Sequence, residues 1–406
     1  MSTNLTSLLL VSIYRNILND EVVSSFVKFL NLLSSDEKNF VDDLKSYSDF
    51  IAKFYDKSFD QNLYEYVKHL VYTDENIISK GCSNCIKENE QLLNTARYEL
   101  TLLDNLLAFD YKTIKDLFLF KYPRMKEVLK HLPLFYTSGI NHFNLEEIID
   151  SYKNKGYGVF SCYSAFKYSQ NNEIKPVEYF DTISFDDLKN YEYQQNVIKQ
   201  NTLAFLQGKN ANNVLLYGDR GCGKSSTVKA LINEFSDYNL KIIQVYKEAF
   251  LHLPELYEKL RNLPLKFIIF ADDISFDEDE KNFSSIKAIL EGSLSNKPSN
   301  TLIYATTNRM HLVKESFSSR EGNEVHYNDT IDEMVSLSDR FGIMLTFSSL
   351  TKNEYLDIVK QIADDCCVEF SDELLKEAYS FTMQKGIMTP RVARQFINDY
   401  IAKKTV

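Results

Sequence analysis

Hydrophobic positions in the first third of the chain recur at intervals of three and four residues. Two such series are Val22, Val23, Phe26, Val27, Leu30, Leu33 and Phe40, Leu44, Tyr47, Ile51, Phe54. This spacing places apolar side chains on one face of a helix. It predicts a mainly α-helical N-terminal domain over residues 1–180, whose Tyr and Phe side chains pack in a core rather than forming a base-stacking surface.

The period changes near Gly156. The segment GYGVFSCYSAFKYS predicts one or two short strands near residues 156–168, and the polar stretch QNNEIKPVEYFD follows it. We therefore expect the N-terminal domain to end near Asp181.

Beyond that point, short apolar runs alternate with stretches of helical spacing. The expected strands are residues 213–217, 241–245, 266–271, 301–305 and 343–347. Buried strands separated by helices predict an α/β domain over residues 181–350, with a mostly parallel sheet covered on both faces. Three further helical segments, 351–364, 371–383 and 390–402, predict a helical C-terminal domain over residues 351–406.

Length and charge limit the possible classes of protein. The 406 residues exceed what one core normally accommodates, and the net charge of −11 gives no overall electrostatic attraction to nucleic acid or anionic membrane. The apolar run at residues 8–13 is much shorter than the roughly 20 residues that span a bilayer, and it lacks a signal-peptide cleavage site. The six cysteines are too few for a disulfide framework in so long a chain. We expect a cytoplasmic protein with no membrane association.

One glycine-rich segment matches a phosphate-binding loop. Residues 218–225 read GDRGCGKS, which satisfies G-x-x-x-x-G-K-[ST], between the apolar NNVLLY and the amphipathic SSTVKALINEF. Backbone N–H groups and the positive end of the following helix hold phosphates in such a loop. The candidate nucleotide-binding residues are Gly218, Asp219, Arg220, Gly221, Cys222, Gly223, Lys224, Ser225 and Ser226.

Within this loop, Lys224 is expected to reach the β and γ phosphates and Ser225 to ligate Mg²⁺. The alternative is a chance match, which average residue usage makes rare in a chain of this length. Cys222 is either a redox-sensitive group or simply a small residue at a tolerant position.

A pair of carboxylates follows another predicted strand. The segment LKFIIFADD ends in Asp272 and Asp273, the Walker B arrangement, in which the first carboxylate holds Mg²⁺ and the second polarises the attacking water. An acidic turn is the alternative. Because Asp273 is one methylene shorter than the glutamate often found there, we predict slow hydrolysis. The acidic run 277–280 reads as a solvated loop rather than a second metal site.

Two more segments complete a resemblance to the AAA+ ATPases. TLIYATTNR places Asn308 at the end of a strand, and SLSDRFGI places Arg340 before the next strand. From about residue 181 onward the chain resembles this family, and more narrowly an uncharacterised bacterial family of predicted ATPases with a helical N-terminal half. The resemblance implies an AAA+ P-loop core with a five-stranded, mostly parallel sheet, a helical lid, and hydrolysis of ATP with Mg²⁺.

The resemblance also implies roles for individual residues. Asn308 corresponds to sensor 1, which orients the water, and Arg340 to an arginine finger that reaches the γ-phosphate in a neighbouring subunit. A finger acting in trans implies a homo-oligomer, most plausibly a ring. A salt bridge to the nearby acidic helix containing IDEM is the alternative for Arg340.

The last predicted helix and the segment before the P-loop supply further candidates. In MTPRVARQF, Thr389 is the expected N-cap, and Arg391 and Arg394 share one helical face. Arg391 is preferred as sensor 2, because TPR resembles the lid of the Holliday-junction branch-migration ATPases, and Arg394 is the alternative. The segment ISFDDLKNYEYQ resembles the stretch that cups the adenine base, with Asn190 where glycine is common.

A CxxC motif, Cys82 and Cys85, stands alone without a second pair at metal-ligand spacing. His69, His131 and His142 are too scattered in the sequence to complete a zinc site. Packing between helices and loops is therefore favoured over a zinc or redox role for this motif.

Two functional hypotheses follow. The first is an ATPase whose oligomer remodels an unidentified protein or nucleic-acid partner selected by the N-terminal helices. The second is a nucleotide-loaded switch or loader that recruits a partner and hydrolyses ATP slowly or negligibly. A nucleic-acid partner rests only on the likeness of the lid, since the net charge does not support it.

Overall fold

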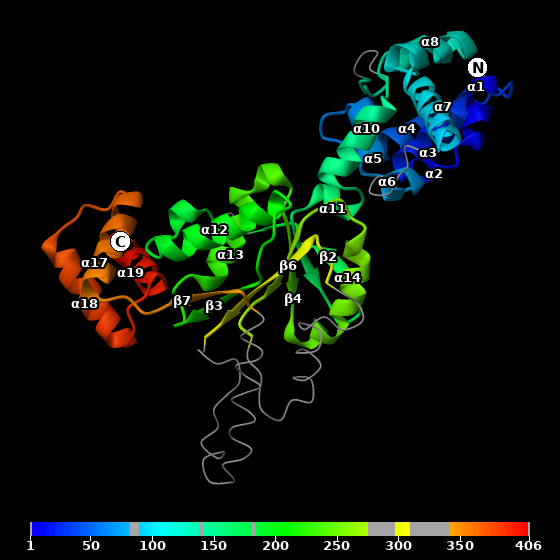
Figure 1. Cartoon of the computed structure of the whole chain (residues 1–406). Coiled ribbons are helices and arrows are strands. Elements are labelled where there is room, and N and C mark those ends of the chain that lie inside the picture. Colours follow the sequence, from blue (N-terminus) through cyan, green and yellow to red (C-terminus); the bar gives the residue numbers. More distant parts are fainter. Residues whose placement is uncertain are drawn as a thin grey trace. The chain divides into compact units, whose positions relative to one another are not determined.

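The structure, a computed structural model, describes residues 2–81, 89–137, 142–180, 183–274, 297–308 and 341–404 (Figure 1). The chain divides into two compact units, Met1–Cys162 and Tyr163–Val406. Among the described residues, none of the helices combines the length and apolar character needed to cross a lipid bilayer.

The first unit is built from helices, as the periodicity of its sequence predicts. Asn or Asp side chains cap many of them; Asn62, for example, accepts the N–H groups of Tyr64 and Glu65 at the start of α5. The helices are α1 (Ser2–Ser7), η1 (Leu8–Leu10), α2 (Arg15–Asn19), α3 (Glu21–Leu33), α4 (Phe40–Lys57), α5 (Leu63–Thr73), α6 (Ile77–Gly81), α7 (Glu90–Leu107), α8 (Tyr111–Lys121), η3 (Pro123–Met125), α9 (Lys126–Leu129), α10 (Leu145–Lys155) and α11 (Val159–Cys162).

Aromatic side chains fill the core between α3, α4 and α8. Phe29, Tyr47, Phe50, Phe54 and Phe118 are fully buried, and the rings of Phe50 and Phe54 stack at 5.8 Å between centroids. The buried Tyr47 hydroxyl donates to a backbone carbonyl, which satisfies its polar atom. The prediction that these aromatic stripes form a core is confirmed.

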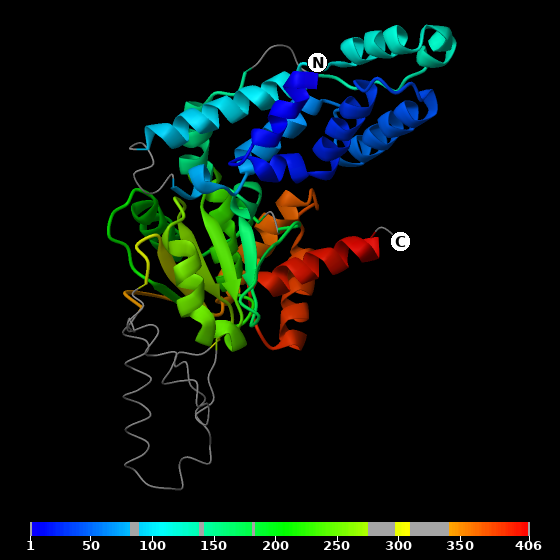
Figure 2. The same cartoon turned by 90° about the vertical axis from the view of Figure 1, so that its right-hand side faces the viewer.

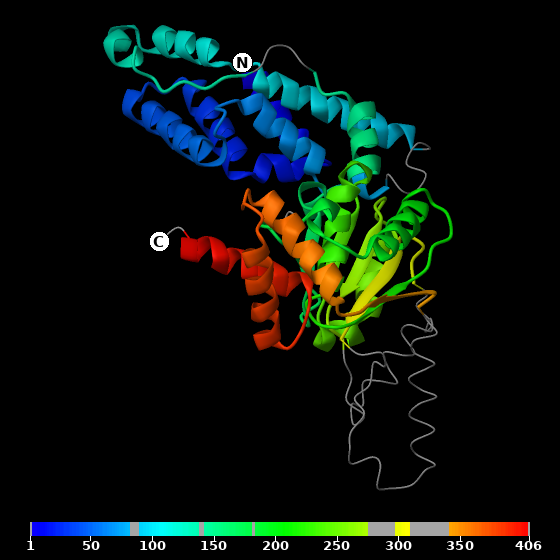
Figure 3. The same ribbon diagram turned by 90° about the vertical axis from the view of Figure 1, so that its left-hand side faces the viewer.

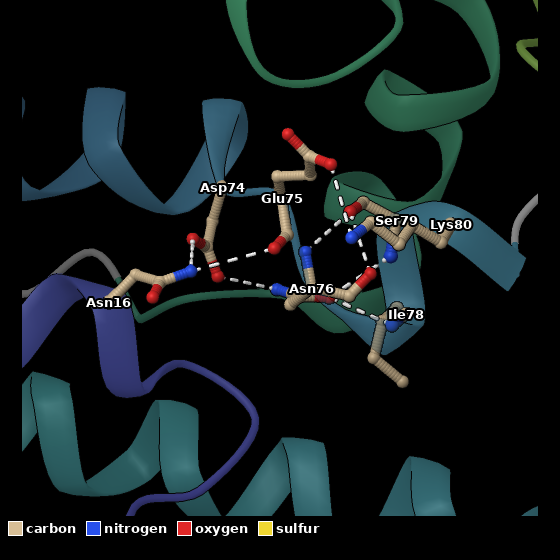
Figure 4. A network of polar contacts seen from close by, with 7 residues as sticks. All are labelled: Asn16, Asp74, Glu75, Asn76, Ile78, Ser79 and Lys80. Atoms are coloured by element: carbon tan, nitrogen blue, oxygen red, sulfur yellow. Dashed lines mark hydrogen bonds and ion pairs between the residues drawn. The ribbon is translucent and has the colours of Figure 1, made fainter. Parts of the chain in front are cut away.

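A network of hydrogen bonds lies at the N-terminus of α6 (Figure 4). The Oδ1 atom of Asn76 accepts the N–H groups of Ile78 at 2.8 Å and Ser79 at 3.0 Å, and its Nδ2 atom donates to Asp74 at 2.7 Å. Asn16, the second residue of α2, donates to the other oxygen of Asp74 at 3.0 Å. These contacts tie α2 to the turn between α5 and α6. Cys82 and Cys85 follow α6 directly and lie outside the described residues.

The second unit contains a seven-stranded sheet in the order β2-β1-β4-β5-β6-β3-β7, in which only the β1–β2 pair is antiparallel. All five strands that the sequence predicts are present. The strands are β1 (Ala165–Tyr168), β2 (Ile174–Pro176), β3 (Val214–Gly218), β4 (Lys241–Val245), β5 (Phe267–Ala271), β6 (Thr301–Thr307) and β7 (Ile343–Phe347).

The division between the units lies before β1, whereas the sequence places it near Asp181. The difference arises because β1 pairs in parallel with β4, so that β1 and β2 extend the sheet of the second unit. Only the second half of the segment 156–168 is a strand, since residues Val159–Cys162 form the short helix α11.

Helices cover both faces of the sheet (Figures 1 and 2). On one face, α12 and α13 bury Ile198, Phe205 and Leu231 against alternate strand residues such as Leu216 and Tyr304. In Figure 1, α14 lies on the opposite face. The helices of this core are η4 (Phe185–Asp187), α12 (Glu192–Leu206), α13 (Lys224–Glu234), η5 (Ser236–Tyr238), η6 (Lys247–His252) and α14 (Leu253–Arg261).

Three helices form the C-terminal lid, α17 (Lys352–Asp365), α18 (Asp372–Lys385) and α19 (Pro390–Lys404), coloured orange to red in Figure 3. They enclose their own apolar cluster, which includes Tyr355, Ile358 and Phe396. Thr351 and Glu354 form a capping box at the start of α17. The three helical segments expected after residue 350 are confirmed.

Candidate nucleotide site

The glycine-rich loop connects β3 to α13. It leaves the sheet at Gly218, between β6 and β7, and ends at Gly223, which is the N-cap of α13. The first N–H groups of this 11-residue helix and the positive end of its dipole therefore lie at the loop. This geometry favours an anion such as a phosphate group.

Two glycines of the loop are required by close packing. A Cβ atom on Gly218 would lie 2.1 Å from the carbonyl oxygen of Phe347, and one on Gly221 would lie 3.0 Å from Oγ1 of Thr389. Both residues have positive φ, +131° and +83°, which disfavours any other amino acid. The loop is thus packed against the end of β7 on one side and against the lid on the other.

Lys224 is almost fully buried within the loop. Its Nζ atom donates to the carbonyl oxygens of Gly218 at 2.8 Å and Asp219 at 2.7 Å, and to Oδ1 of Asn308 at 3.0 Å. Burial lowers the pKa of Lys224, against the opposing attraction of nearby acidic groups. These three oxygens belong to neutral groups, and a buried ammonium in such surroundings favours an added anion.

Ser225, Asp272 and Thr306 meet beside Lys224. The hydroxyl groups of Ser225 and Thr306 donate to the same Asp272 oxygen, Oδ1, at 2.5 Å and 2.7 Å. Ser225 comes from the start of α13, Asp272 directly follows β5, and Thr306 lies in β6. The structure therefore brings together Ser225 and Asp272, the two expected metal ligands.

Asp273 is exposed and points toward Asn308. The Nδ2 atom of Asn308 donates to Oδ1 of Asp273 at 2.5 Å, so that Asn308 links Lys224 to Asp273. The backbone of Asp273 is left-handed, with φ of 51°, which costs a residue other than glycine about 1 kcal/mol. The Asp273 N–H donates to Oγ1 of Thr306 at 2.8 Å, which stabilises this conformation.

These residues fit Mg²⁺ and a nucleoside triphosphate. A hydroxyl and a carboxylate are hard oxygen ligands, which Mg²⁺ prefers, and Mg²⁺ is commonly held by only one or two protein groups together with phosphate oxygens. Lys224 and the start of α13 supply the positive charge for the phosphates. Among the described residues, no group of three or more His, Cys, Asp or Glu side chains forms another candidate metal site.

The lid contributes α19 to the same site. The Arg391 N–H donates to the carbonyl oxygen of Gly221 at 3.4 Å, and the exposed Arg391 side chain starts beside that glycine. Arg394, one turn further along, is half-buried and lines a cavity behind the loop. Both candidates for sensor 2 therefore lie next to the P-loop, Arg391 at its outer edge and Arg394 at the cavity.

This cavity, of about 50 Å³, lies between the loop, the lid and the segment before α12. Leu188, Tyr191, Thr227 and Ile362 contribute to its walls. The segment expected to cup the base therefore lies at the loop.

Two left-handed residues shape this segment, Asn190 with φ of 68° and Tyr191 with φ of 67°. Asn190 thus adopts the left-handed conformation that glycine adopts most easily. Gln195 holds the turn by donating from Nε2 to the carbonyl oxygens of Leu188 at 3.0 Å and Asn190 at 2.9 Å.

The loop is also tied to the linker between β7 and the lid. The carboxylate of Asp219 accepts the Ser349 N–H at 2.7 Å and its hydroxyl at 2.6 Å, and these bonds lower the pKa of Asp219. Cys222 is buried, which raises the pKa of its thiol, and its Sγ atom lies 3.6 Å from the carbonyl oxygen of Ser348. A buried thiol of raised pKa is unreactive, which favours a packing role for Cys222.

Not every candidate residue can be placed. Arg340 lies outside the described residues, as does the acidic run 277–280. Arg220 is exposed and Ser226 half-buried at the loop. Sequence reasoning missed Thr306, Gln195 and Ser349; only the position of Thr306, two residues before Asn308 on a strand, offered a signal, because alternate strand residues share a face.

Comparison with protein families matches residues 161–404 to the family described as "Protein of unknown function (DUF815)". A search of curated proteins finds no significant match.

Solved structures of similar fold include the RuvB Holliday junction branch migration motor of Thermotoga maritima, at 23% identity and a TM-score of 0.34, covering 52% of this chain and 62% of that chain. A single-residue variant of the same RuvB protein has 19% identity, a TM-score of 0.37 and the same coverage. The AAA domain of FIGL-1 in complex with ADP has 18% identity and a TM-score of 0.33, covering 50% of this chain and 68% of that chain. The chain thus spans 62% of the length of these RuvB chains.

These TM-scores are below 0.5, so the assignment of the AAA+ fold depends on the features described above: the P-loop between β3 and α13, the acidic pair after β5, Asn308 after β6, and the helical lid. The family match covers more than half of the chain and coincides with the unit that carries all of them. The protein therefore belongs to the DUF815 family, and its second unit is an AAA+ P-loop domain.

Proposed function

We propose that the protein is an ATPase of the AAA+ type that binds and hydrolyses Mg-ATP as an oligomer and uses the energy to remodel a protein or nucleic-acid partner. The observation that carries this proposal is the convergence of Lys224, Asn308 and Asp273 in one chain of contacts, with distances of 3.0 Å and 2.5 Å. A loop with only a structural role does not require a buried lysine, an amide and an exposed carboxylate that are linked by successive hydrogen bonds.

Each residue has a distinct task in this proposal. Lys224 and the N–H groups at the start of α13 hold the β and γ phosphates, and Ser225 and Asp272 hold Mg²⁺. Bound Mg²⁺ supplies neutralisation of the charge on the phosphate oxygens. Asp273 accepts a proton from the attacking water, which Asn308 orients. Arg391 approaches the phosphates from the lid as sensor 2.

We further propose that Arg340 acts in trans as an arginine finger, so that the active form is a homo-oligomer, most plausibly a ring. An arginine finger contributes about 10³- to 10⁵-fold to the rate. ATP turnover per subunit should therefore rise steeply with protein concentration, and Arg340→Ala should abolish it at unchanged ATP affinity.

Turnover that is independent of protein concentration and insensitive to Arg340→Ala would exclude the role of Arg340 as an arginine finger. It would also exclude the requirement for an oligomer. ATP affinity is measured in parallel, because a loss of binding would instead indicate misfolding or a direct role for Arg340 in the nucleotide site.

A second candidate function is a switch or loader that binds ATP and hydrolyses it slowly. The short Asp273 side chain favours it, because an aspartate reaches one methylene less far toward an attacking water than the glutamate often found at this position. Asp273→Glu should then increase turnover, and Asp273→Asn should abolish it. Equal turnover in all three proteins would exclude Asp273 from the chemistry.

The partner is proposed to be selected by the first, helical unit. The acidic net charge of −11 and the scattered cysteines support a cytoplasmic location, and this charge favours a protein partner over nucleic acid. Binding to single- or double-stranded DNA that weakens as salt increases would favour nucleic acid instead.

A further inference from the structure

Thr306 contacts three successive residues of the segment that follows β5. Its Oγ1 atom donates to Oδ1 of Asp272 at 2.7 Å and accepts the Asp273 N–H at 2.8 Å. Its carbonyl oxygen accepts the Ile274 N–H at 2.8 Å. Thr306 is only 1% exposed, so water does not compete for these bonds.

These contacts determine where both carboxylates point. Asp273 has the left-handed φ of 51°, which a residue with a side chain rarely adopts without support. The bonds from the N–H groups of Asp273 and Ile274 to Thr306 hold the chain in this turn. The bond to Oδ1 fixes the rotation of the Asp272 carboxylate.

We propose that Thr306 is a positioning residue for Mg²⁺, acting through Asp272; this inference rests on the proposed function of the site. Ser225 donates to the same Asp272 oxygen, but as a metal ligand it turns its hydroxyl oxygen toward the cation. Among the described residues, Thr306 is then the donor that keeps the Asp272 carboxylate oriented. Partners of this kind commonly change metal affinity by about 10- to 100-fold.

The test measures the affinity for fluorescent ADP with Mg²⁺ and, separately, with EDTA, in the full-length protein. Thr306→Val keeps the shape of the side chain and removes the hydroxyl. It should leave the affinity in EDTA unchanged and reduce the gain in affinity from Mg²⁺ by about tenfold or more. Thr306→Ser, which retains the hydroxyl, should preserve most of that gain.

Thr301→Val is the matched control. Thr301 is equally buried at the other end of β6, and its hydroxyl donates to the carbonyl oxygen of Pro298 at 3.0 Å, away from the site. It should leave both affinities unchanged. Thermal unfolding confirms that each variant is folded, and Thr306→Ala replaces Thr306→Val should the latter not fold.

The outcomes separate this inference from the proposed function. Suppose that Mg²⁺ increases the affinity of the wild-type protein for fluorescent ADP, and increases that of folded Thr306→Val or Thr306→Ala by the same factor. The inference is then overturned, whereas the nucleotide site stands. If the wild-type protein binds no nucleotide in either condition, both are overturned.

Discussion

Two arginines of α19 approach the P-loop at different places. Arg391 starts beside Gly221 at the outer edge of the loop, whereas Arg394 lines the cavity with Tyr191 and Cys222. They are three residues apart and would be hard to tell apart by helical spacing alone. We infer from these surroundings that Arg391 would contact a bound phosphate and Arg394 the rest of the nucleotide.

At the residue scale we therefore predict different kinetic effects. Arg391→Ala should lower kcat by about 10- to 100-fold, because it removes a charged hydrogen bond to the reacting phosphate. Arg394→Ala should mainly raise KM, because it removes binding that is equal in the ground and transition states. Steady-state kinetics of both variants check this, and the reverse pattern would make Arg394 the sensor.

At the scale of elements, the P-loop is connected to the linker that leads into the lid. Asp219 binds the backbone N–H and the hydroxyl of Ser349, and Tyr191 donates to the carbonyl oxygen of Ser348 at 2.6 Å. The two residues after β7, Ser348 and Ser349, are thus hydrogen-bonded to the loop and to Tyr191 before α12.

Ser349→Ala should reduce stability in a pH-dependent way. The bonds from Ser349 hold the folded pKa of Asp219 below its usual value of 3.8, so their contribution is complete above that value and is lost as pH falls through the folded pKa. Because Asp219 is exposed, we expect a loss of about 1 kcal/mol or less. Urea unfolding of both proteins from pH 3 upward, about one unit at a time, measures it.

The difference between the two proteins should be largest near neutral pH and should shrink toward acid pH, as Asp219 becomes protonated. Asp219→Asn provides the control, since it removes the charge at every pH. A difference that grows toward acid pH would contradict the assignment.

At the scale of the whole molecule, every described residue of the nucleotide site lies in the second unit, Tyr163–Val406. The first unit has its own aromatic core and contributes no described residue to the site. The boundary before β1 is important here, because β1 belongs to the sheet through its pairing with β4.

We predict that a fragment of residues 163–406 binds ATP about as tightly as the full chain, whereas a fragment starting at residue 181 is less stable. The second fragment lacks β1 and β2 and leaves the edge of β4 unpaired. Isothermal titration and thermal unfolding of both fragments check this. A folded 163–406 fragment that binds ATP much more weakly would show that the first unit contributes to the site.

The sequence by itself determined the elements and the central motifs. Hydrophobic spacing predicts the helices of the first unit, five strands and the lid, because burial on one face leaves a regular pattern along the chain. The P-loop, Asp272, Asp273 and Asn308 are recognisable because each directly follows an apolar strand.

Only the tertiary structure decided which residues from distant segments meet. The place of β1 in the sheet depends on its pairing with β4, about 75 residues later, which leaves no local signal. The contacts of Thr306 with Asp272 and of Ser349 with Asp219 likewise join separate segments through ordinary Ser and Thr residues. Spacing reveals local structure, whereas such long-range hydrogen bonds depend on how the strands and the lid are packed together.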